Sequence, residues 1–530
     1  MSDYIIIGAG SAGCILANRL SSDPAVRVTL IEAGGKDRNL MYRMPAGYFE
    51  LMKSGMGNWN FETVPQPGLN GRTMYVPRGK VLGGSSSING MAVSWGNPGD
   101  YDHWEDLGNQ GWSFRDCLPY FKRVESFAEG DEEFRGRTGP VGITLTKRTE
   151  MNQISRSWVQ AAVEAGHHFN EDYNARTPEG IALMQGNYAN GLRQSTAHSY
   201  LRPAMSRPNL TIISNALVSR IVIKEGRAVG VEYFDRTGLR FCEATREVIL
   251  SGGAINSPQL LQLSGIGNPD DIKPHGLAVK HELPGVGRNL RDHLSISLKQ
   301  KITKPYSVLK SLGPIGMASS FAKYLLFRSG PAATNGLETW AHVKTQASLE
   351  YPDIQMYCLP LMFSNHGRDL IRDEGFMASV TASRPISSGT VKIASADPTS
   401  APAIDPNYLA DPDDLRVLRD GLRIARDIIS QKPFDAFRGL ELAPGKQATT
   451  DVELDQYIRQ NALSIYHPVG TCKMGNDDNA VVDTSLRVRG LDGLRVIDAS
   501  IMPNIPSGNT NFPVMMLAEK GAEMIIKSQK

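Results

Sequence analysis

The stretch YIIIGAGSAG, residues 4–13, decides the fold of this chain. Its first four residues are a short apolar run typical of a buried parallel strand, and the GxGxxG pattern then leads into a helix-like stretch ending near Leu20. A second apolar run, residues 26–31, ends at Glu32, which follows the last glycine by 32 − 13 = 19 residues. Strand, glycine turn, helix and carboxylate in this order predict a dinucleotide site, with a pyrophosphate over the turn and a ribose hydroxyl on Glu32. A glycine-rich turn without a ligand is the alternative.

Length and composition bound the class of protein. With 530 residues the chain exceeds the usual size of one hydrophobic core, so two domains are expected. Lys and Arg number 57 against 55 Asp and Glu, a net charge of +2 without long runs of either sign, so nucleic acid is not an expected partner. The five cysteines have no metal-ligand or disulfide spacing, which predicts free thiols, a reducing compartment and no metal site.

Two missing patterns bear on localisation. No basic segment followed by an apolar one precedes the glycine turn, so a standard signal peptide is not predicted. No stretch reaches the roughly 18 consecutive apolar residues that a membrane span needs. We therefore expect a cytoplasmic protein, soluble or peripheral at the inner face of the membrane.

Three further segments combine small and polar residues. Residues 79–89, GKVLGGSSSIN, form a loop whose backbone can lie against a flat or anionic group. Residues 253–267 predict a second strand-to-helix turn. Near the C-terminus, YHPVGT at 466–471 precedes DAS at 498–500 and GNTN at 508–511. The GxGxxG fingerprint by itself is common to NAD and FAD, so an NAD-dependent oxidoreductase is a second candidate from that motif.

With these segments the sequence resembles the glucose-methanol-choline oxidoreductase family, from Tyr4 to about Ile526. The match is weaker at Val93, where that family often has an aromatic residue or alanine. The resemblance implies an α/β fold in which a Rossmann-like FAD-binding domain is interleaved with a substrate-binding domain made of a sheet and helices. The FAD-binding domain would take residues 1–150, 191–300 and 461–530, and the substrate-binding domain 151–190 and 301–460.

Local patterns predict the elements of this arrangement. Residues 217–233 predict a hairpin that turns at 225–226. Strand and helix periodicities predict strands over 351–359, 376–382 and 389–394 and helices over 413–429 and 513–526.

The resemblance implies that FAD is bound without a covalent bond. Members that attach the flavin through the 79–89 loop have a histidine immediately before the asparagine, whereas Ile88 precedes Asn89 here. Two of the residues assigned to FAD have a structural alternative: Val218 could belong to a plain surface hairpin, and Asp498 could cap a helix. The residues assigned to FAD are Gly8, Gly10, Ser11, Ala12, Gly13, Glu32, Ala33, Arg78, Leu82, Gly83, Gly84, Ser85, Asn89, Gly90, Met91, Ala92, Val218, Gly253, Asp498, Ala499, Asn509 and Thr510.

Oxidation of an alcohol needs a base for the hydroxyl proton and an acceptor for the hydride. Histidine suits the first task, because a pKa of roughly 6.5 leaves much of it neutral. Each of the ten histidines has the bland alternative of a surface or core residue, but His467 lies in the HPxGT segment that resembles the family's catalytic loop. Asn511, 511 − 467 = 44 residues later, matches the second catalytic position. The resemblance implies that His467 takes the proton and that Asn511 donates a hydrogen bond to the substrate oxygen.

The substrate and the electron acceptor are predicted in outline. Segments such as NWNF at 58–61 and SSSIN at 85–89 are similar to those of bacterial choline, medium-chain alcohol and polyethylene glycol dehydrogenases. We expect an uncharged primary alcohol with an aliphatic or polyether chain, oxidised to the aldehyde, and choline is the alternative. Glu338 and Tyr466 are predicted to lie in the substrate pocket. A quinone or another respiratory carrier is the expected acceptor, and oxygen is the alternative.

One apolar segment and one other function class complete the expectations. Residues 308–327 are apolar with scattered lysines, which suits a lid, a patch on a membrane surface or a buried core helix. A lyase or a flavoprotein without catalytic activity is the other class, and the pair of His467 and Asn511 argues against it.

Overall fold

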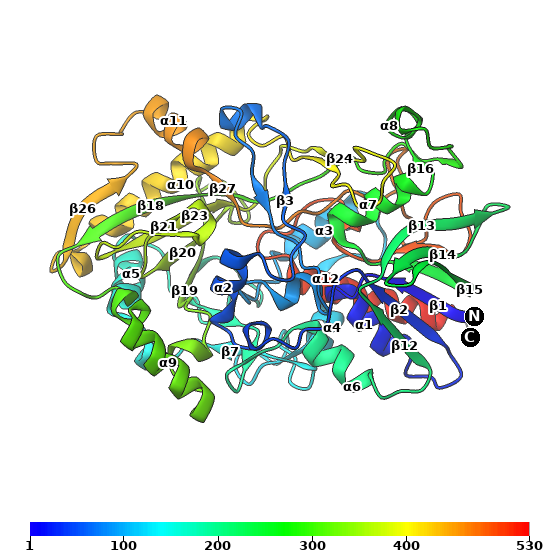
Figure 1. The fold of residues 1–530 in the computed structure, drawn as a ribbon. Coiled ribbons are helices and arrows are strands. Elements are labelled where there is room, and N and C mark those ends of the chain that lie inside the picture. The colour runs from blue at the N-terminus through cyan, green and yellow to red at the C-terminus, as the bar shows by residue number, and fades with distance from the viewer. Residues whose placement is uncertain (529–530) are drawn as a thin grey trace.

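The structure is a computed structural model that describes residues 1–528. It holds two seven-stranded sheets, which lie toward opposite ends of an elongated molecule (Figure 1). Each sheet has its own core of buried apolar side chains. The α/β fold predicted from the sequence is therefore present.

The first sheet contains the strand that precedes the GxGxxG turn. Strands β12, β2, β1, β15 and β28 pair in parallel, and β15 also continues into an antiparallel ribbon with β14 and β13. The predicted strands at 4–7 and 26–31 and the hairpin at 217–233 are confirmed. The bounds are β1 (Ser2–Ile7), β2 (Val28–Glu32), β12 (Leu210–Ser214), β13 (Leu217–Lys224), β14 (Arg227–Asp235), β15 (Gly238–Leu250) and β28 (Leu494–Val496).

The second sheet is antiparallel, with the order β26-β18-β23-β20-β19-β8 and β27 paired to β18. Its strands at 354–359 and 375–382 match the predicted ones closely. The sheet takes strands from several of the expected domain segments, and β18 runs across the expected boundary at residue 300. The bounds are β8 (Gly180–Leu183), β18 (Leu294–Ile302), β19 (Thr339–Val343), β20 (Ile354–Leu359), β23 (Gly375–Ala382), β26 (Arg438–Ala443) and β27 (Leu463–Ser464).

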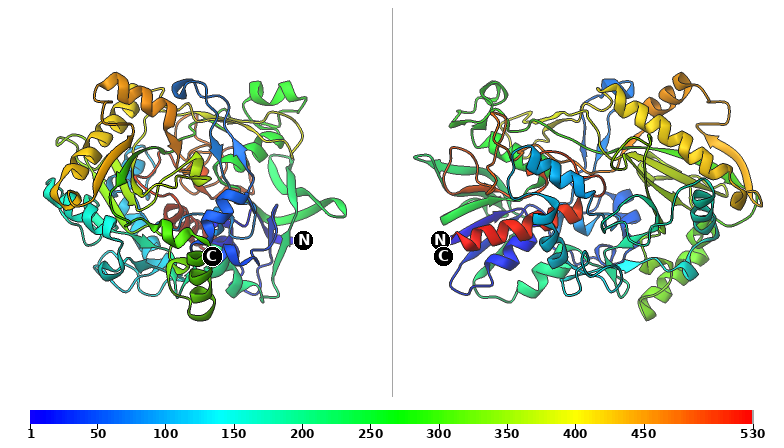
Figure 2. Two further views of the ribbon diagram at one scale, coloured as in Figure 1. Left: turned by 60° about the vertical axis from the view of Figure 1, so that its left-hand side comes forward. Right: turned by 180° about the vertical axis from the view of Figure 1, so that it is seen from behind.

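Helices pack against both sheets, as the two rotated views show (Figure 2). In the first half α1 packs against α12, and in the second half α10 packs against β23 and α5. The predicted helices at 413–429 and 513–526 correspond to α10 and α12. The bounds are α1 (Ser11–Leu20), α2 (Gly47–Ser54), α3 (Pro98–Asp106), α4 (Phe114–Val124), α5 (Gln153–Glu164), α6 (Arg202–Ala204), α7 (Gly253–Leu263), α8 (Pro269–Ile272), α9 (Pro314–Phe327), α10 (Pro412–Ser430), α11 (Asp451–Asn461) and α12 (Asn511–Lys527).

Helix α9 does not enter a core. It projects from the lower edge of the molecule (Figure 1), and its side chains at Ile315, Leu326 and Phe327 are 87%, 73% and 73% exposed. Only Tyr324 of this helix is buried, in a small cluster with Met44 and neighbouring residues. The alternative of a buried core helix for residues 308–327 is therefore wrong, because Tyr324 is the only side chain of α9 that is buried.

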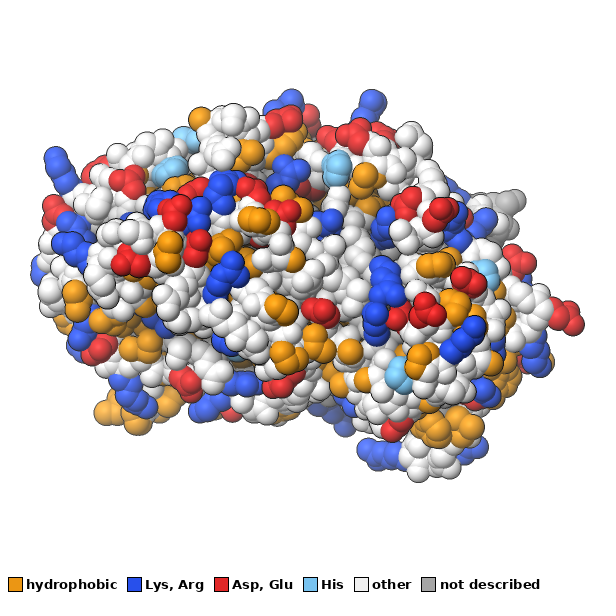
Figure 3. All heavy atoms as spheres, turned by 90° about the horizontal axis from the view of Figure 1, so that it is seen from above, with side chains coloured by type: hydrophobic (Ala, Val, Ile, Leu, Met, Phe, Trp, Pro, Cys, Tyr) orange, Lys and Arg blue, Asp and Glu red, His pale blue; other side chains and the backbone are white. Residues whose placement is uncertain are grey.

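Charges on the molecular surface are mixed. Acidic and basic side chains are interspersed over the face seen from above (Figure 3), in line with the net charge of +2. None of the helices within residues 1–528 combines the length and the apolar character that crossing a bilayer requires.

Candidate active site

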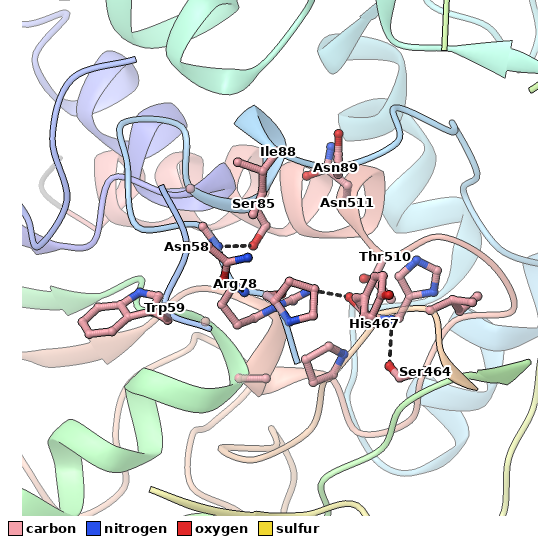
Figure 4. Close-up of a pocket in the computed structure, with 18 of the residues that line it drawn as sticks. Asn58, Trp59, Arg78, Ser85, Ile88, Asn89, Ser464, His467, Thr510 and Asn511 are labelled. Atoms are coloured by element: carbon pink, nitrogen blue, oxygen red, sulfur yellow. Dashed lines mark hydrogen bonds between the residues drawn. The ribbon is translucent and has the colours of Figure 1, made fainter. Parts of the chain in front are cut away.

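A cavity of about 680 Å³ lies between the two sheets and takes its lining from both. Figure 4 shows Asn89 and Asn511 together on one side of it and His467 near Ser464 on the other. Most of the residues predicted for FAD, catalysis and substrate are brought together here. Those that line the cavity are Gly8, Gly10, Ser11, Ala12, Glu32, Ala33, Arg78, Gly84, Ser85, Asn89, Gly90, Met91, Ala92, Val218, Gly253, Tyr466, His467, Asp498, Ala499, Asn509, Thr510 and Asn511.

Three predicted FAD residues lie behind the lining and shape it. A Cβ on Gly13 would come within 1.9 Å of the carbonyl oxygen of Gly8, so this glycine allows α1 to start directly against the turn. Gly83 has a φ of +90°, and a Cβ there would meet Ser87 Oγ at 2.2 Å. Leu82 is 1% exposed and anchors the same loop in the first core. These residues set the backbone of the cradle.

The two glycine-rich loops touch one another. A Cβ on Gly84, whose φ is +52°, would lie 2.6 Å from the Cα of Gly10, and the N–H of Gly83 donates to the carbonyl oxygen of Ala9. Backbone therefore meets backbone where the turn at 8–13 faces the loop at 79–89. A surface of this kind leaves room and free N–H groups for a pyrophosphate at the N-terminus of α1.

Glu32 closes the end of this cradle. Its carboxylate accepts the N–H groups of Ala9 and Gly34, both at 2.8 Å, and still lines the cavity. Burial raises the pKa of Glu32 to about 7, against the two backbone hydrogen bonds that lower it. A buried carboxyl group with unused lone pairs is suited to accept the hydroxyl groups of a ribose.

Asp498 was predicted either to contact FAD or to cap a helix, and its position is compatible with both. It caps a short 3₁₀ turn by accepting the N–H of Ser500 at 2.8 Å, and its other oxygen accepts from Gly253 N at 2.9 Å and Ser257 Oγ at 2.6 Å. The second pair of bonds ties the end of β28 to the start of α7. Asp498 is thus a cap that also lines the cavity.

Asn511 presents an unused donor. Its side-chain oxygen accepts the hydroxyl of Ser11 at 2.7 Å, while its buried Nδ2 has no hydrogen-bond partner among the described residues. Buried polar groups are rarely left without a partner, so this amide calls for a ligand. The glycine cradle, Glu32 and the free amide together fit a dinucleotide cofactor such as FAD.

His467, which lines the cavity, forms a hydrogen bond with a second histidine, His293. Its Nδ1 lies 3.0 Å from Nδ1 of His293, whose Nε2 lies 2.9 Å from the carbonyl oxygen of Ser383. A carbonyl only accepts, so neutral His293 carries its proton on Nε2 and offers Nδ1 as an acceptor. His467 must then donate from Nδ1. Its Nε2 is left unprotonated, which is the state that a general base needs.

Asp292 fixes the backbone around this pair. One carboxylate oxygen accepts the N–H of His467 at 2.7 Å, and the other accepts the hydroxyl groups of Tyr408 and Ser464, both at 2.5 Å. Asp292 is 5% exposed, and burial raises its pKa. It binds the backbone of His467 and no imidazole nitrogen, so it positions the loop that carries His467 rather than polarising the ring.

The imidazoles are neutral in this environment. Burial is the main cause that lowers the pKa of His467 well below 6.5, and the electrostatic interactions with His293 and Arg78 lower it further. Burial also lowers the pKa of His293 to about 4. Both rings are therefore neutral near neutral pH, each with a single proton, in agreement with the proton arrangement that the hydrogen bonds require.

Sequence reasoning missed the contribution of β18. Asp292 and His293 immediately precede this strand. At alternate positions along the strand, Ser295, Ser297 and Lys299 line the cavity. The signal was available, because residues 294–302 read LSISLKQKI, a period of two with one polar face. The pairing of His293 with His467, separated by 174 residues, had no local signal.

The two predicted substrate residues have different positions. Tyr466 lines the cavity, and its hydroxyl lies 2.6 Å from Nδ1 of His366. Glu338 does not line it: its carboxylate accepts the N–H of Asn152 at 2.9 Å, at the N-terminal end of α5. The structure therefore brings Tyr466, but not the Glu338 side chain, to the pocket.

Comparison with protein families gives two matches with the same description, GMC oxidoreductase, over residues 2–295 and 385–518. An oxygen-dependent choline dehydrogenase of Photobacterium profundum is 42% identical over 99% of this chain and 93% of that protein. The mitochondrial choline dehydrogenase of Mus musculus is 42% identical over 98% of this chain and 89% of that protein.

Solved structures give the same picture. Pyridoxine 4-oxidase from Mesorbium loti superposes with a TM-score of 0.91 at 30% identity, covering 99% of both chains. A formate oxidase of Aspergillus oryzae superposes with a TM-score of 0.93 at 26% identity, covering 99% of this chain and 98% of that one. These matches span both sheets, so they confirm the whole α/β architecture expected from the sequence.

Proposed function

The chain belongs to the GMC oxidoreductase family and is an FAD-dependent oxidoreductase that acts on CH–OH donors. We propose that it oxidises a primary alcohol with an uncharged aliphatic or polyether chain to the aldehyde. The observation that carries this proposal is the single cavity in which the glycine cradle meets His467 and Asn511. Bound FAD supplies the hydride acceptor of such a reaction.

The residues of the chain supply the proton chemistry. Nε2 of His467 takes the hydroxyl proton, because His293 holds the other ring nitrogen as a donor. The free Nδ2 of Asn511 donates to the substrate oxygen, and its own oxygen is fixed by Ser11. The positive end of α12, which begins at Asn511, favours the negative charge that develops near it.

The charge of the cavity favours an uncharged alcohol over choline. The carboxylates that line it within residues 1–528 belong to Glu32 and Asp498, which both lie in the nucleotide half. The substrate half offers the cations Lys299 and Arg72 instead. A quaternary ammonium ion would meet two like charges there. Choline is the second candidate, supported by the two choline dehydrogenases that are 42% identical to this chain.

Anaerobic addition of a panel of primary alcohols to the yellow protein tests the proposal. Bleaching of the flavin band by 1-alkanols or oligoethylene glycols at lower concentrations than by choline is expected. Bleaching by choline alone would make the chain a choline dehydrogenase, and no bleaching by any alcohol would remove the proposed activity.

FAD is held without a covalent bond in this proposal. Ile88, which precedes Asn89, has no nucleophilic atom, and the segment from Arg78 to Gly99 contains no cysteine, histidine or tyrosine. Retention then depends on the cradle, on Glu32 and on burial. Acid precipitation should release all yellow colour into the supernatant, and a yellow pellet would show a covalent link.

A quinone in the membrane is the proposed electron acceptor, and α9 is the proposed contact with the lipid. Residues 303–337, which include α9, contain no Asp or Glu, but four cations, Lys304, Lys310, Lys323 and Arg328. Exposed apolar side chains beside cations match an anionic bilayer. Oxygen is the alternative acceptor, since the similar dehydrogenase of Photobacterium profundum is named oxygen-dependent.

Cosedimentation with phosphatidylglycerol vesicles tests the membrane contact. The combined variant Ile315→Ser, Leu326→Ser and Phe327→Ser should lose vesicle binding. The matched control, Leu239→Ser with Phe241→Ser, removes apolar groups that are 54% and 53% exposed on β15 and should leave binding intact. Equal binding by both variants would exclude α9 as the contact.

The acceptor is tested by turnover. Reoxidation by a soluble quinone analogue should be faster than reoxidation in air-saturated buffer. Equal rates would make the chain an oxidase.

A further inference from the structure

The floor of the cavity is one face of the second sheet. Along β18, Ser295, Ser297 and Lys299 line the cavity, whereas Ile296 and Leu298 lie in the core against the covering helices. A strand alternates its side chains between two faces, so this alternation assigns the odd-numbered positions to the cavity. His293, which contacts the catalytic base, has the same parity and immediately precedes the strand.

The floor changes character along the strand. The register pairs Ser297 with Ser379 and Ser379 with Tyr357, all lining residues with hydroxyl groups. Two residues further on, Lys299 pairs with Met377, which pairs with Leu359. The hydroxyl-rich row lies nearer His293, and the lysine is set in an apolar row beyond it.

Lys299 is a cation without a matched anion. It is half-buried, burial lowers its pKa, and no charged neighbour among the described residues contributes to that shift. By contrast, Lys301 on the same strand pairs with Asp373 at 3.3 Å and does not line the cavity. The guanidinium of Arg72, the other cation of this half, is occupied by the carbonyl oxygens of Arg459 and Ala462. An ammonium group that faces a cavity and lacks a counter-ion has its attraction available for a ligand.

We propose that Lys299 is a specificity residue that binds an anionic group, a carboxylate, at the far end of the alcohol substrate. The inference rests on the proposed alcohol oxidation but replaces the uncharged alcohol as the preferred substrate by an ω-hydroxy acid with an aliphatic chain. The hydroxyl end lies at His467, the chain runs along the floor, and the carboxylate pairs with the ammonium group of Lys299.

The strand sets the length of this substrate. From His293 to Lys299 the chain advances 299 − 293 = 6 residues, which at about 3.4 Å per residue is roughly 20 Å between the two Cα atoms. A flexible lysine side chain shortens the distance that the substrate must span. Short hydroxy acids cannot reach both groups, so selectivity for the carboxylate should appear only above a certain chain length.

Three substrates of equal chain length test the proposal: an ω-hydroxy acid, a 1-alkanol and an ω-hydroxyalkyl trimethylammonium ion. For the native protein kcat/KM should follow that order. The substitution Lys299→Met should reduce the ratio of kcat/KM for the acid to kcat/KM for the alkanol by about 10-fold, the scale of a partly exposed charged hydrogen bond. Because Lys299 lies far from the reacting carbon, the change should be found in KM and not in kcat.

Two further variants separate charge from packing. Lys299→Arg should keep the preference for the acid, and Lys299→Glu should reverse the order in favour of the ammonium ion. The matched control Lys301→Met removes the same charge two residues further along β18 and should leave every ratio unchanged.

The outcomes separate the two proposals. If no alcohol reduces the flavin, the proposed function itself fails. If alkanols reduce it but the acid has no advantage at any chain length, or if Lys299→Met and Lys299→Glu leave the ratios unchanged, Lys299 does not select the substrate. Using the ratio within each variant removes the effect of any general loss of folded protein.

Discussion

The two halves of the cavity are built by different means. In the nucleotide half the contacts come from backbone, where the turn at 8–13 and the loop at 79–89 meet glycine against glycine. In the substrate half they come from side chains on one face of a sheet, held in register by neighbouring strands. An added Cβ at Gly13, Gly83 or Gly84 of the cradle would lie 1.9, 2.2 or 2.6 Å from another atom, whereas a side-chain floor can be altered residue by residue. The first half should therefore be the more sensitive to substitution.

Gly13→Ala is expected to have the largest effect. The added Cβ would lie 1.9 Å from the carbonyl oxygen of Gly8, so α1 must move away from β1 and the pyrophosphate site opens. The purified variant should contain almost no FAD, as measured by the ratio of flavin to protein absorbance. Gly313→Ala is the control, because a Cβ there meets nothing nearer than 3.5 Å. Normal FAD content in Gly13→Ala would show that the cradle adapts.

His467→Ala tests the point where the two halves meet. The variant should keep FAD but reduce it with alcohol roughly 100-fold or more slowly, the usual scale for loss of a general base. Anaerobic stopped-flow spectroscopy measures the rate. His103→Ala, at an exposed position of α3, serves as the control and should not change it. A rate near that of the native protein would assign the proton transfer to another group.

His293→Ala should have a smaller effect of about 10-fold, since it removes only the partner that orients the base. Without the acceptor at 3.0 Å, the proton of His467 can occupy either ring nitrogen. His293→Gln offers an amide oxygen as an acceptor and should recover part of the rate. If Ala and Gln behave alike, the histidine acts through packing and not through its hydrogen bond.

The dependence of the rate on pH is the smallest predicted effect. Burial lowers the pKa of His467 well below 6.5, so protonation of the base in the free protein requires a more acidic solution than for an ordinary histidine. The rate constant for flavin reduction should thus change little between neutral pH and 6.5 and fall only below that range. An acidic limb centred at or above 6.5 would contradict the buried, neutral histidine pair.

The nucleotide half was largely predictable because its determinants are local. GxGxxG, the strand before it and Glu32 lie within residues 4–32, and the loop at 79–89 carries its own glycines. In the substrate half, Tyr466 lines the cavity, whereas the carboxylate of Glu338 lies at the N-terminal end of α5. Whether a side chain faces a pocket depends on strand register, which a one-residue shift reverses.

The sequence by itself determined the family and the α/β fold, because motifs and their order can be identified without knowledge of contacts. It also predicted the pair His467 and Asn511 as catalytic residues. Only the tertiary structure decided which ring nitrogen of His467 is free. That choice depends on a carbonyl at Ser383 and a ring at His293, brought together from 84 and 174 residues away along the chain by the pairing of strands. It also decided that Lys299 faces the cavity without a counter-ion within residues 1–528. Proton positions and unpaired charges are properties of neighbours in space, and the order of residues does not encode those neighbours locally.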